Sequence, residues 1–217
     1  MTEVTLAPRA VLFDLDGTLI DSSRDMVAAW PQVVSEARLV LGDVAALHGV
    51  PARQSLARLL GPERQEELPH WLELLLELEC TNTDQTRALP GAAELLGLLE
   101  GSTMTWGVVT SCATRLARAR LTATGLPVPE LLVTADDVVN GKPDPEPFLL
   151  GVRLAGCAPA ESLVVEDAIA GIESGLAAGA VVVAVTTTHR ADELSRAHHV
   201  LPDLPALTRA LRLVPSN

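Results

Sequence analysis

The stretch AVLFDLDGT, residues 10–18, joins an apolar run to two aspartates. The run Ala10–Phe13 predicts a buried strand, and Asp14 and Asp16 follow it. Side chains at positions i and i+2 of an extended segment point the same way, so both carboxylates face one spot beyond the end of the strand. Like charges that close are tolerated when a cation lies between them or when one carboxyl group keeps its proton. The stretch therefore predicts an acidic site at the end of a strand.

Outside this stretch, short apolar runs rich in β-branched residues alternate with amphipathic segments, which is typical of a parallel sheet with crossover helices. The strands are expected at residues 10–13, 106–110, 131–134, 163–165 and 181–185. The connecting helices are expected at residues 92–99, 114–124, 145–155 and 168–178. The pattern predicts an α/β fold, with a Rossmann-like parallel sheet and helices on both faces.

Residues 21–87 have a different pattern. The stretches SSRDMVAAWPQVVSEARLV and PERQEELPHWLELLLELE, at 22–40 and 62–79, are helical in pattern, and the region holds no strand candidate. We therefore expect an all-helical insert at residues 21–87, after the first strand. The α/β core is then formed by residues 1–20 and 88–217.

Composition narrows the partners of the chain. The formal net charge of −12 argues against a general polyanion binder, because affinity for phosphate backbones depends on clustered Lys and Arg. The longest apolar stretch, AAGAVVVAV, is far short of the ~20 residues that a membrane helix needs. The few cysteines are not spaced as metal pairs, so neither a disulfide framework nor a zinc site is indicated. We expect a soluble cytoplasmic protein, a monomer or weak homodimer, with no nucleic acid or membrane partner.

Polar side chains follow the expected strands or precede the next helix, at the end where open parallel sheets bind ligands. They are Asp14, Asp16, Thr110, Ser111, Lys142, Glu166 and Asp167. If the strands lie side by side, four carboxylates, one lysine and two hydroxyl groups converge. Carboxylates and carbonyls suit Mg²⁺, a hard cation that commonly binds phosphate substrates. The sequence therefore predicts phosphoryl transfer.

Four motifs in this order, DLDGT, VVTS, GKPDPEPF and VVEDAIAGIESGLAAGA, resemble the haloacid dehalogenase (HAD) superfamily over nearly the whole chain. The resemblance is to the branch whose helical cap is inserted directly after the first motif, which makes the insert a cap. More narrowly, HGVPARQSLARLL, ALPGAAELL and GLPVPELLVTADDVVNGKPDPEPFLLG resemble segments of bacterial sugar phosphatases and of the 2-deoxyglucose-6-phosphate and glycerol-phosphate phosphatases.

The resemblance implies a role for each residue of the site. Asp14 would attack phosphorus and form an aspartyl-phosphate. Asp16 would protonate the leaving oxygen and then activate water. Thr110 and Ser111 would bind the phosphoryl group, and Lys142 would offset its charge.

The resemblance also implies a metal site and no organic cofactor. Asp14, the main-chain carbonyl of Asp16, and Asp167 are the expected Mg²⁺ ligands. Glu166 is expected either as a direct ligand or as a partner of one. Gly17 is expected to permit a backbone geometry that a side chain would hinder.

Two features concern selectivity and a departure from the family pattern. In HGVPARQS, a turn at Gly49 and Pro51 lets His48 and Arg53 project polar groups toward a closing site, or else the segment is a surface loop with a solvated arginine. Cys112 stands where glycine is common in the family. It either packs at a helix start or carries a thiolate made reactive by the helix terminus.

Three functions are compatible with these residues. The first is a Mg²⁺-dependent phosphatase that hydrolyses sugar or polyol phosphates through an aspartyl-phosphate. The second is a phosphomutase of the β-phosphoglucomutase type, whose basic cap residues match a segment that here has His48 and Ala52, with Arg53 shifted by one. The third is a non-enzymatic module, which would be expected to have lost a motif residue. Dehalogenases of the superfamily lack the aspartate equivalent to Asp16, so Asp16 weighs against dehalogenation. The phosphomutase also keeps this aspartate, and the mismatch in the cap segment favours hydrolysis over it.

Overall fold

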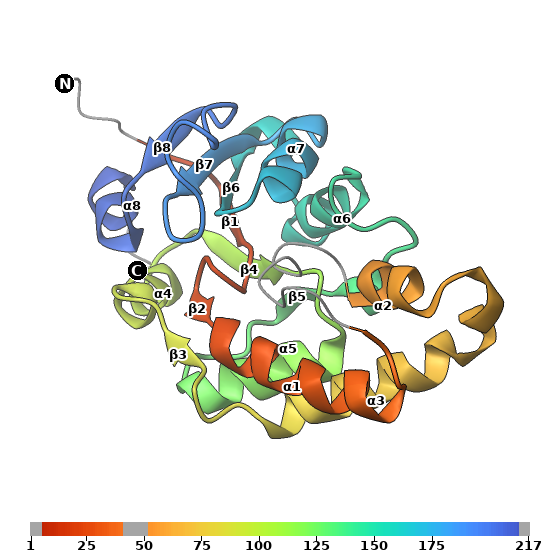
Figure 1. Cartoon of the computed structure of the whole chain (residues 1–217). Helices are drawn as coiled ribbons and strands as arrows, with labels where there is room; N and C mark the ends of the chain where they lie inside the picture. The colour runs from red at the N-terminus through yellow and green to blue at the C-terminus, as the bar shows by residue number, and fades with distance from the viewer. Residues whose placement is uncertain (1–5, 41–51, 213–217) are drawn as a thin grey trace. The chain divides into compact units, whose positions relative to one another are not determined.

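The structure is a computed structural model that describes residues 6–40 and 52–212 (Figure 1). The chain divides into two compact units. The first unit comprises residues 1–21 and 87–217, and the second comprises residues 22–86. Each unit has a hydrophobic core of its own.

The first unit is built on a six-stranded sheet whose strands are all parallel. Its order is β5-β4-β1-β6-β7-β8. The strands are β1 (Ala10–Phe13), β4 (Thr105–Val109), β5 (Leu131–Val133), β6 (Ser162–Glu166), β7 (Val181–Val185) and β8 (His199–Leu201). In β1, Phe13 is in register with Val108 of β4 and Val165 of β6. The polar residues that follow these three strands therefore meet at one edge of the sheet.

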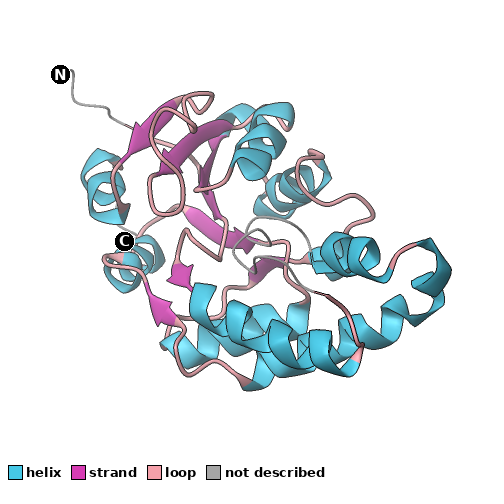
Figure 2. Cartoon of the chain, in the orientation of Figure 1, coloured by secondary structure: helices cyan, strands magenta, loops and turns pink. Residues whose placement is uncertain are grey.

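Helices cover both faces of this sheet (Figure 2). Val11 and Phe13 pack with the leucines of α4 (Ala92–Glu100), and α5 (Thr114–Thr124) and α8 (Leu204–Ala210) join the same cluster. Leu12, which points the other way, packs with α6 (Glu146–Ala155) and α7 (Ile169–Ala177). The predicted α/β class, with helices on both faces of a parallel sheet, is confirmed.

The apolar pattern of the sequence did not predict the short elements at the sheet edge and at the insertion point. β8 is a three-residue edge strand in which only Val200 and Leu201 are apolar, too few for an apolar run to stand out in the sequence. α8, which follows β8, is only 7 residues long. β2 (Ile20–Asp21) and β3 (Arg87–Ala88) pair antiparallel where the chain leaves and re-enters the first unit. Two residues per strand are too few to show alternation.

The second unit is helical. It consists of α1 (Ser23–Glu36), α2 (Ala52–Leu60), the 3₁₀ segment η2 (Pro62–Glu67) and α3 (Leu68–Thr81). Their buried side chains form one cluster, which includes Trp30, Leu56 and Leu75. The carboxylate of Asp25 in α1 accepts hydrogen bonds from the Gln85 amide and from the Thr86 hydroxyl, the latter over 2.6 Å. The first helix is thereby tied to the last residues of its own unit.

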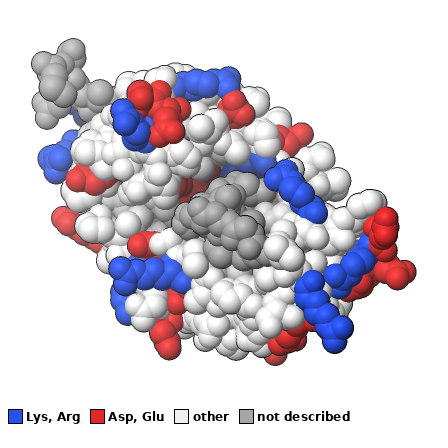
Figure 3. All heavy atoms as spheres, in the orientation of Figure 1, with Lys and Arg blue, Asp and Glu red and all other residues white. Residues whose placement is uncertain are grey.

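The surface carries both signs of charge. In the face drawn in Figure 3, Lys and Arg side chains are interspersed with Asp and Glu. Across residues 6–40 and 52–212, every helix is too short or too polar to cross a membrane.

Candidate active site

A tight turn follows β1 and brings two parts of the site together. Gly17 has a φ of +88°, which L side chains rarely adopt, and a Cβ there would lie 2.2 Å from Oδ2 of Asp167. The next residue, Thr18, is buried and donates its hydroxyl hydrogen to Oδ1 of Asp167 over 3.0 Å. The predicted need for glycine at position 17 is confirmed, because this turn lies against a carboxylate.

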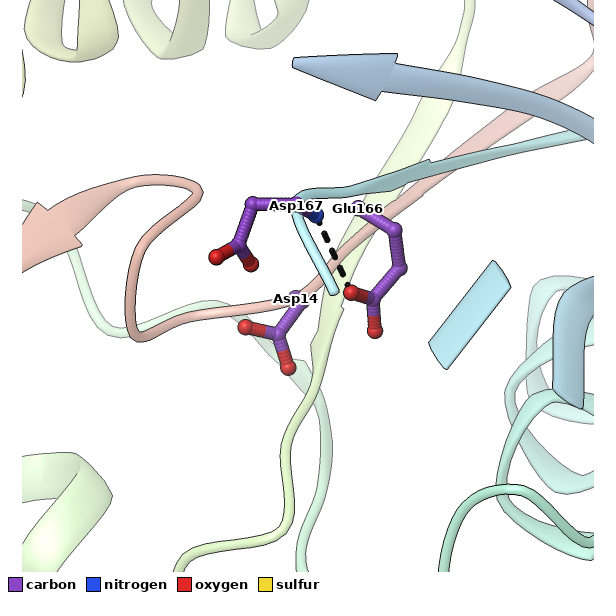
Figure 4. A group of neighbouring side chains, drawn as sticks. All are labelled: Asp14, Glu166 and Asp167. Carbon is purple, nitrogen blue, oxygen red and sulfur yellow. Dashed lines mark hydrogen bonds between the residues drawn. The ribbon is translucent and has the colours of Figure 1, made fainter. Parts of the chain in front are cut away.

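Three buried carboxylates meet at the ends of the adjacent strands β1 and β6 (Figure 4). One ligating atom each from Asp14, Glu166 and Asp167 lies within 4.8 Å of the others. Burial raises the pKa of Asp14 well above its usual value, and the neighbouring carboxylates raise it further against the opposing charge of Lys142. Burial and the charge of Glu166 raise the pKa of Asp167 to about 6. The three carboxylates repel one another, and this repulsion is relieved when a cation binds or when one carboxyl group keeps its proton.

The positively charged side chain of Lys142 contacts two carboxylates of this cluster. Its Nζ donates to Oδ1 of Asp14 over 2.5 Å, to Oε1 of Glu166 over 2.7 Å and to the carbonyl of Val109 over 2.8 Å. Burial opposes the charge of the ammonium group, but the two carboxylates outweigh it and raise the pKa of Lys142. The side chain therefore stays protonated at neutral pH.

The loop that carries Lys142 is held by acidic residues of the same motif. Glu146 accepts hydrogen bonds from the amides of Val139 and Asn140 over 2.8 and 2.9 Å, which lower its pKa. Asp144 accepts the amide of Glu146, and its carbonyl accepts the Ser174 hydroxyl of α7 over 2.6 Å. These contacts explain the two carboxylates of GKPDPEPF as supports of the loop.

Glu166 is occupied on both of its oxygens. Oε1 accepts from Lys142, and Oε2 accepts from the amides of Asp167 and Ala168 over 3.1 and 3.2 Å. A Cβ on Gly171 of α7 would lie 1.7 Å from Oε1. Glu166 is thus enclosed by the beginning of α7, with few lone pairs left for another ligand.

Thr110 follows β4 and is buried, whereas Ser111 is exposed. The Thr110 amide donates to the carbonyl of Val133, and its hydroxyl oxygen accepts the amide of Cys112 over 3.1 Å. Among the residues that the structure describes, the Thr110 hydroxyl hydrogen has no acceptor, so it suits an anion at the sheet edge.

The carboxylate of Asp16 lies in contact with β4–α5 residues. Arg120 of α5 donates to Oδ1 of Asp16 over 2.9 Å, and the Cys112 thiol donates to Oδ2 over 2.9 Å. Burial and the charge of Asp16 raise the pKa of Cys112 well above its usual value. The thiol therefore keeps its proton, and the reactive thiolate considered from the sequence is disfavoured.

The loop after β7 adds contacts that the sequence did not reveal. The Thr188 hydroxyl donates to Oδ2 of Asp167, and the Thr187 hydroxyl donates to the carbonyl of Gly17. Nδ1 of His189 lies 3.0 Å from the carbonyl oxygen of Asp167. The position of this loop at the end of a parallel strand was the available signal, because ligand sites gather there.

The predicted cap residues are placed only in part. His48 and Gly49 lie outside the described residues. Arg53 lies in the first turn of α2, where its side chain is exposed.

The donor set of the acidic cluster fits a hard divalent cation. Asp14 and Asp167 offer carboxylate oxygens on one side of the turn, and Glu166 stands beside them. Burial and the charges of the neighbouring carboxylates both raise the pKa values of Asp14 and Asp167, and a bound cation would oppose both effects. Oxygen ligands in this number are typical of Mg²⁺.

Comparisons with known proteins agree with this geometry. The family model of the haloacid dehalogenase-like hydrolases matches residues 11–185. Hexitol phosphatase A of Escherichia coli (strain K12) is 41% identical over 201 residues, covering 92% of this chain and 93% of that protein. A hydrolase from Pseudomonas syringae superposes with a TM-score of 0.79 at 32% identity, covering 92% of this chain and 95% of that one. A protein assigned as a β-phosphoglucomutase from Bacteroides vulgatus superposes with a TM-score of 0.76 at 29% identity, covering 94% and 88%.

The match extends from β1 to the end of β7 and includes each of the four motifs, so the family predicted from those motifs is confirmed. This chain belongs to the haloacid dehalogenase-like hydrolase family.

Proposed function

We propose that the protein is a Mg²⁺-dependent phosphatase that hydrolyses small sugar or polyol phosphates through an aspartyl-phosphate. The observation that carries the proposal is the position of Asp14, a buried carboxylate at the end of the central strand, 2.5 Å from the ammonium group of Lys142. The similarity to a hexitol phosphatase over most of both chains supports the substrate class.

The reaction divides into two displacements at phosphorus. A carboxylate oxygen of Asp14 attacks phosphorus, a new O–P bond forms, and the bond from phosphorus to the alcohol oxygen breaks. Asp16 gives its proton to that leaving oxygen. In the second step Asp16 takes a proton from water, the hydroxide attacks phosphorus, and the Asp14–phosphorus bond breaks. Inorganic phosphate leaves, and both aspartates regain their starting states.

The other side chains stabilise charge at phosphorus. Lys142 keeps a positive charge at the nucleophile, and Thr110 presents a hydroxyl hydrogen at the end of the neighbouring strand. Charge of this kind is most effective in a buried site, where water does not screen it.

Mg²⁺ would be held by Asp14, Asp167 and the carbonyl of Asp16, and it supplies positive charge that offsets that of the phosphoryl oxygens. Glu166 is better suited to orient Lys142 and the Asp167 amide, because both of its oxygens already accept hydrogen bonds.

The helical unit is proposed to act as the cap that selects the leaving group. The core motifs address the phosphoryl group and the metal, so discrimination among alcohols comes from elsewhere, and the segment from His48 to Ser55 is the candidate. We expect a small-molecule phosphate ester as partner, a cytoplasmic location, and a monomer or weak homodimer. The alternative is a phosphomutase of the β-phosphoglucomutase type, which the likeness to the Bacteroides vulgatus protein favours.

The direct test is phosphate release from a panel of sugar, polyol and nucleotide monophosphates, with and without added Mg²⁺. We expect the wild-type protein to release phosphate from hexitol or related phosphates and Asp14→Asn to have no turnover while keeping its melting temperature, since the amide is nearly isosteric but not nucleophilic. Phosphate release by Asp14→Asn at the wild-type rate would refute the mechanism. Conversion of one sugar phosphate into an isomer, without free phosphate, would establish the phosphomutase instead.

A further inference from the structure

Both carboxylate oxygens of Asp16 are held from the side of β4 and α5. Arg120 Nη1 lies 2.9 Å from Oδ1, and the Cys112 sulfur lies 2.9 Å from Oδ2. The same Nη1 atom also donates to the Cys112 sulfur over 3.1 Å. The three side chains therefore form a closed triangle of hydrogen bonds.

The guanidinium group in this triangle is buried. The side chain of Arg120 is 5% exposed and that of Asp16 is 27% exposed. Arg118, two residues earlier in α5, is exposed, so the helix itself does not require burial of its arginines. A buried guanidinium costs free energy unless it is paired, and one partner of Arg120 is Asp16 of the first motif.

The supports of the triangle are themselves fixed. The Cys112 amide donates to the Thr110 hydroxyl, and the Thr114 amide at the beginning of α5 donates to Asp136 over 2.8 Å. The donors to Asp16 thus come from a rigid strand end and a capped helix. An aspartate on a loop has two rotatable bonds, and donors on both oxygens restrict both of them.

We propose that Arg120 and Cys112 are positioning residues that orient the carboxyl group of Asp16 for its two proton transfers, an inference that rests on the function proposed above. Neither residue touches the phosphoryl group in this role. The four motifs assign no chemical role to either residue.

The role makes the two chemical steps respond differently to loss of Arg120. A p-nitrophenolate leaving group needs no proton, so formation of the aspartyl-phosphate from p-nitrophenyl phosphate proceeds without a well-placed Asp16. Hydrolysis of the aspartyl-phosphate needs Asp16 as a base whatever the leaving group was. Loss of orientation therefore slows the second step alone with this substrate.

The experiment follows p-nitrophenolate release by stopped flow with wild type, Arg120→Met, Arg120→Lys and the control Arg118→Met. For Arg120→Met we expect a burst close to one equivalent of enzyme followed by a steady state slowed about 10- to 100-fold, a part of the contribution of general acid–base catalysis. Arg120→Lys should recover part of the steady-state rate because it keeps the charge. Arg118→Met should match wild type.

A second pair of variants covers the case in which Arg120→Met does not fold. Cys112→Ala removes the donor to Oδ2 and should also give a burst with a slowed steady state, whereas Cys112→Ser keeps a donor and should stay near wild type.

Equal slowing of burst and steady state would show a structural role and overturn the inference, as would wild-type rates in both Arg120→Met and Cys112→Ala. A wild-type protein that hydrolyses no phosphate monoester would instead refute the proposed function, and the inference with it. Active wild type with unaffected variants refutes the inference alone.

Discussion

Lys142 Nζ lies 2.5 Å from Oδ1 of Asp14, the carboxylate at the end of the central strand. The same ammonium group donates to the Val109 carbonyl of β4 and to Glu166 of β6. One side chain thereby joins the ends of three adjacent strands. The arrangement of the acidic cluster depends on this single positive charge.

Replacing Lys142 by methionine keeps an apolar stem and removes the charge. We expect Lys142→Met to lower kcat/KM for the best substrate by about 100-fold or more, because the phosphoryl group loses a buried positive partner and Asp14 holds its proton more tightly. The exposed Arg153→Met, in the helix that follows the Lys142 loop, is the control. A loss shared by both variants would contradict the assignment.

Asp167 is expected to set the requirement for Mg²⁺. Asp167→Ala should raise the Mg²⁺ concentration for half-maximal activity, and Thr188→Val should raise it less, because it removes only a hydrogen bond to that carboxylate. Mg²⁺ titrations followed by phosphate release and by calorimetry measure both effects. The exposed Asp192→Ala should leave the requirement unchanged. Full activity of the wild type in excess chelator would exclude a metal requirement.

The raised pKa of Asp167 predicts how the stability of the metal-free protein depends on pH. Because the folded state holds this proton more tightly than the unfolded chain does, its contribution to stability is complete below about pH 4. That contribution is lost as the pH rises through about 6. The shift corresponds to roughly 3 kcal/mol between the two ends of the window.

Thermal melts of metal-free protein from pH 4 to pH 8 measure this loss. Asp167→Asn does not titrate, so we expect it to flatten the pH dependence and to melt at a higher temperature than wild type at pH 8. Added Mg²⁺ should stabilise wild type more at pH 8 than at pH 5. Identical pH profiles for the two proteins would show that Asp167 is not the titrating group.

Two helical glycines provide a matched test of the packing around Glu166. A Cβ on Gly171 would lie 1.7 Å from Oε1 of Glu166, whereas a Cβ on Gly97 of α4 meets no atom within 4 Å. We expect Gly171→Ala to displace Glu166, to destabilise the protein and to lower kcat. Gly97→Ala should stabilise it by about 0.5–1 kcal/mol, because alanine favours a helix. The free energies of unfolding and the rates of the two variants decide the matter.

Selectivity is expected to depend on the helical unit. Replacing His48 and Arg53 by alanine should lower kcat/KM for the best sugar or polyol phosphate much more than for p-nitrophenyl phosphate, whose good leaving group needs little help. Equal losses on both substrates, or no loss on either, would place selectivity elsewhere in the helical unit.

The positions of site residues at the ends of predicted elements could be predicted from the sequence. Asp14 follows an apolar run and lies beside a second aspartate, and Lys142 and Asp167 lie in motifs at the ends of other predicted elements. The parallel register then brings them together, because β1 lies between β4 and β6. Local pattern and sheet topology were sufficient for this part of the site.

Side chains that support the site from a distance were not predictable in the same way. Arg120 is 104 positions from Asp16, and Thr188 is 21 positions from Asp167. One local signal existed for Arg120: it lies four residues after the buried Leu116, so it falls on the apolar face of its helix. A charged residue on an apolar face indicates a buried partner, but the helix pattern does not name that partner.

The antiparallel pair β2–β3, which joins Ile20 to Ala88 and Asp21 to Arg87, makes the insertion point a preformed hairpin stem. The two ends of the helical unit therefore leave the sheet unit side by side, and a two-residue turn would be long enough to close the stem without them. We therefore expect that residues 22–86 can be replaced as one piece. We expect inserts from relatives to be exchangeable at this stem, with the chain of the sheet unit on either side unchanged.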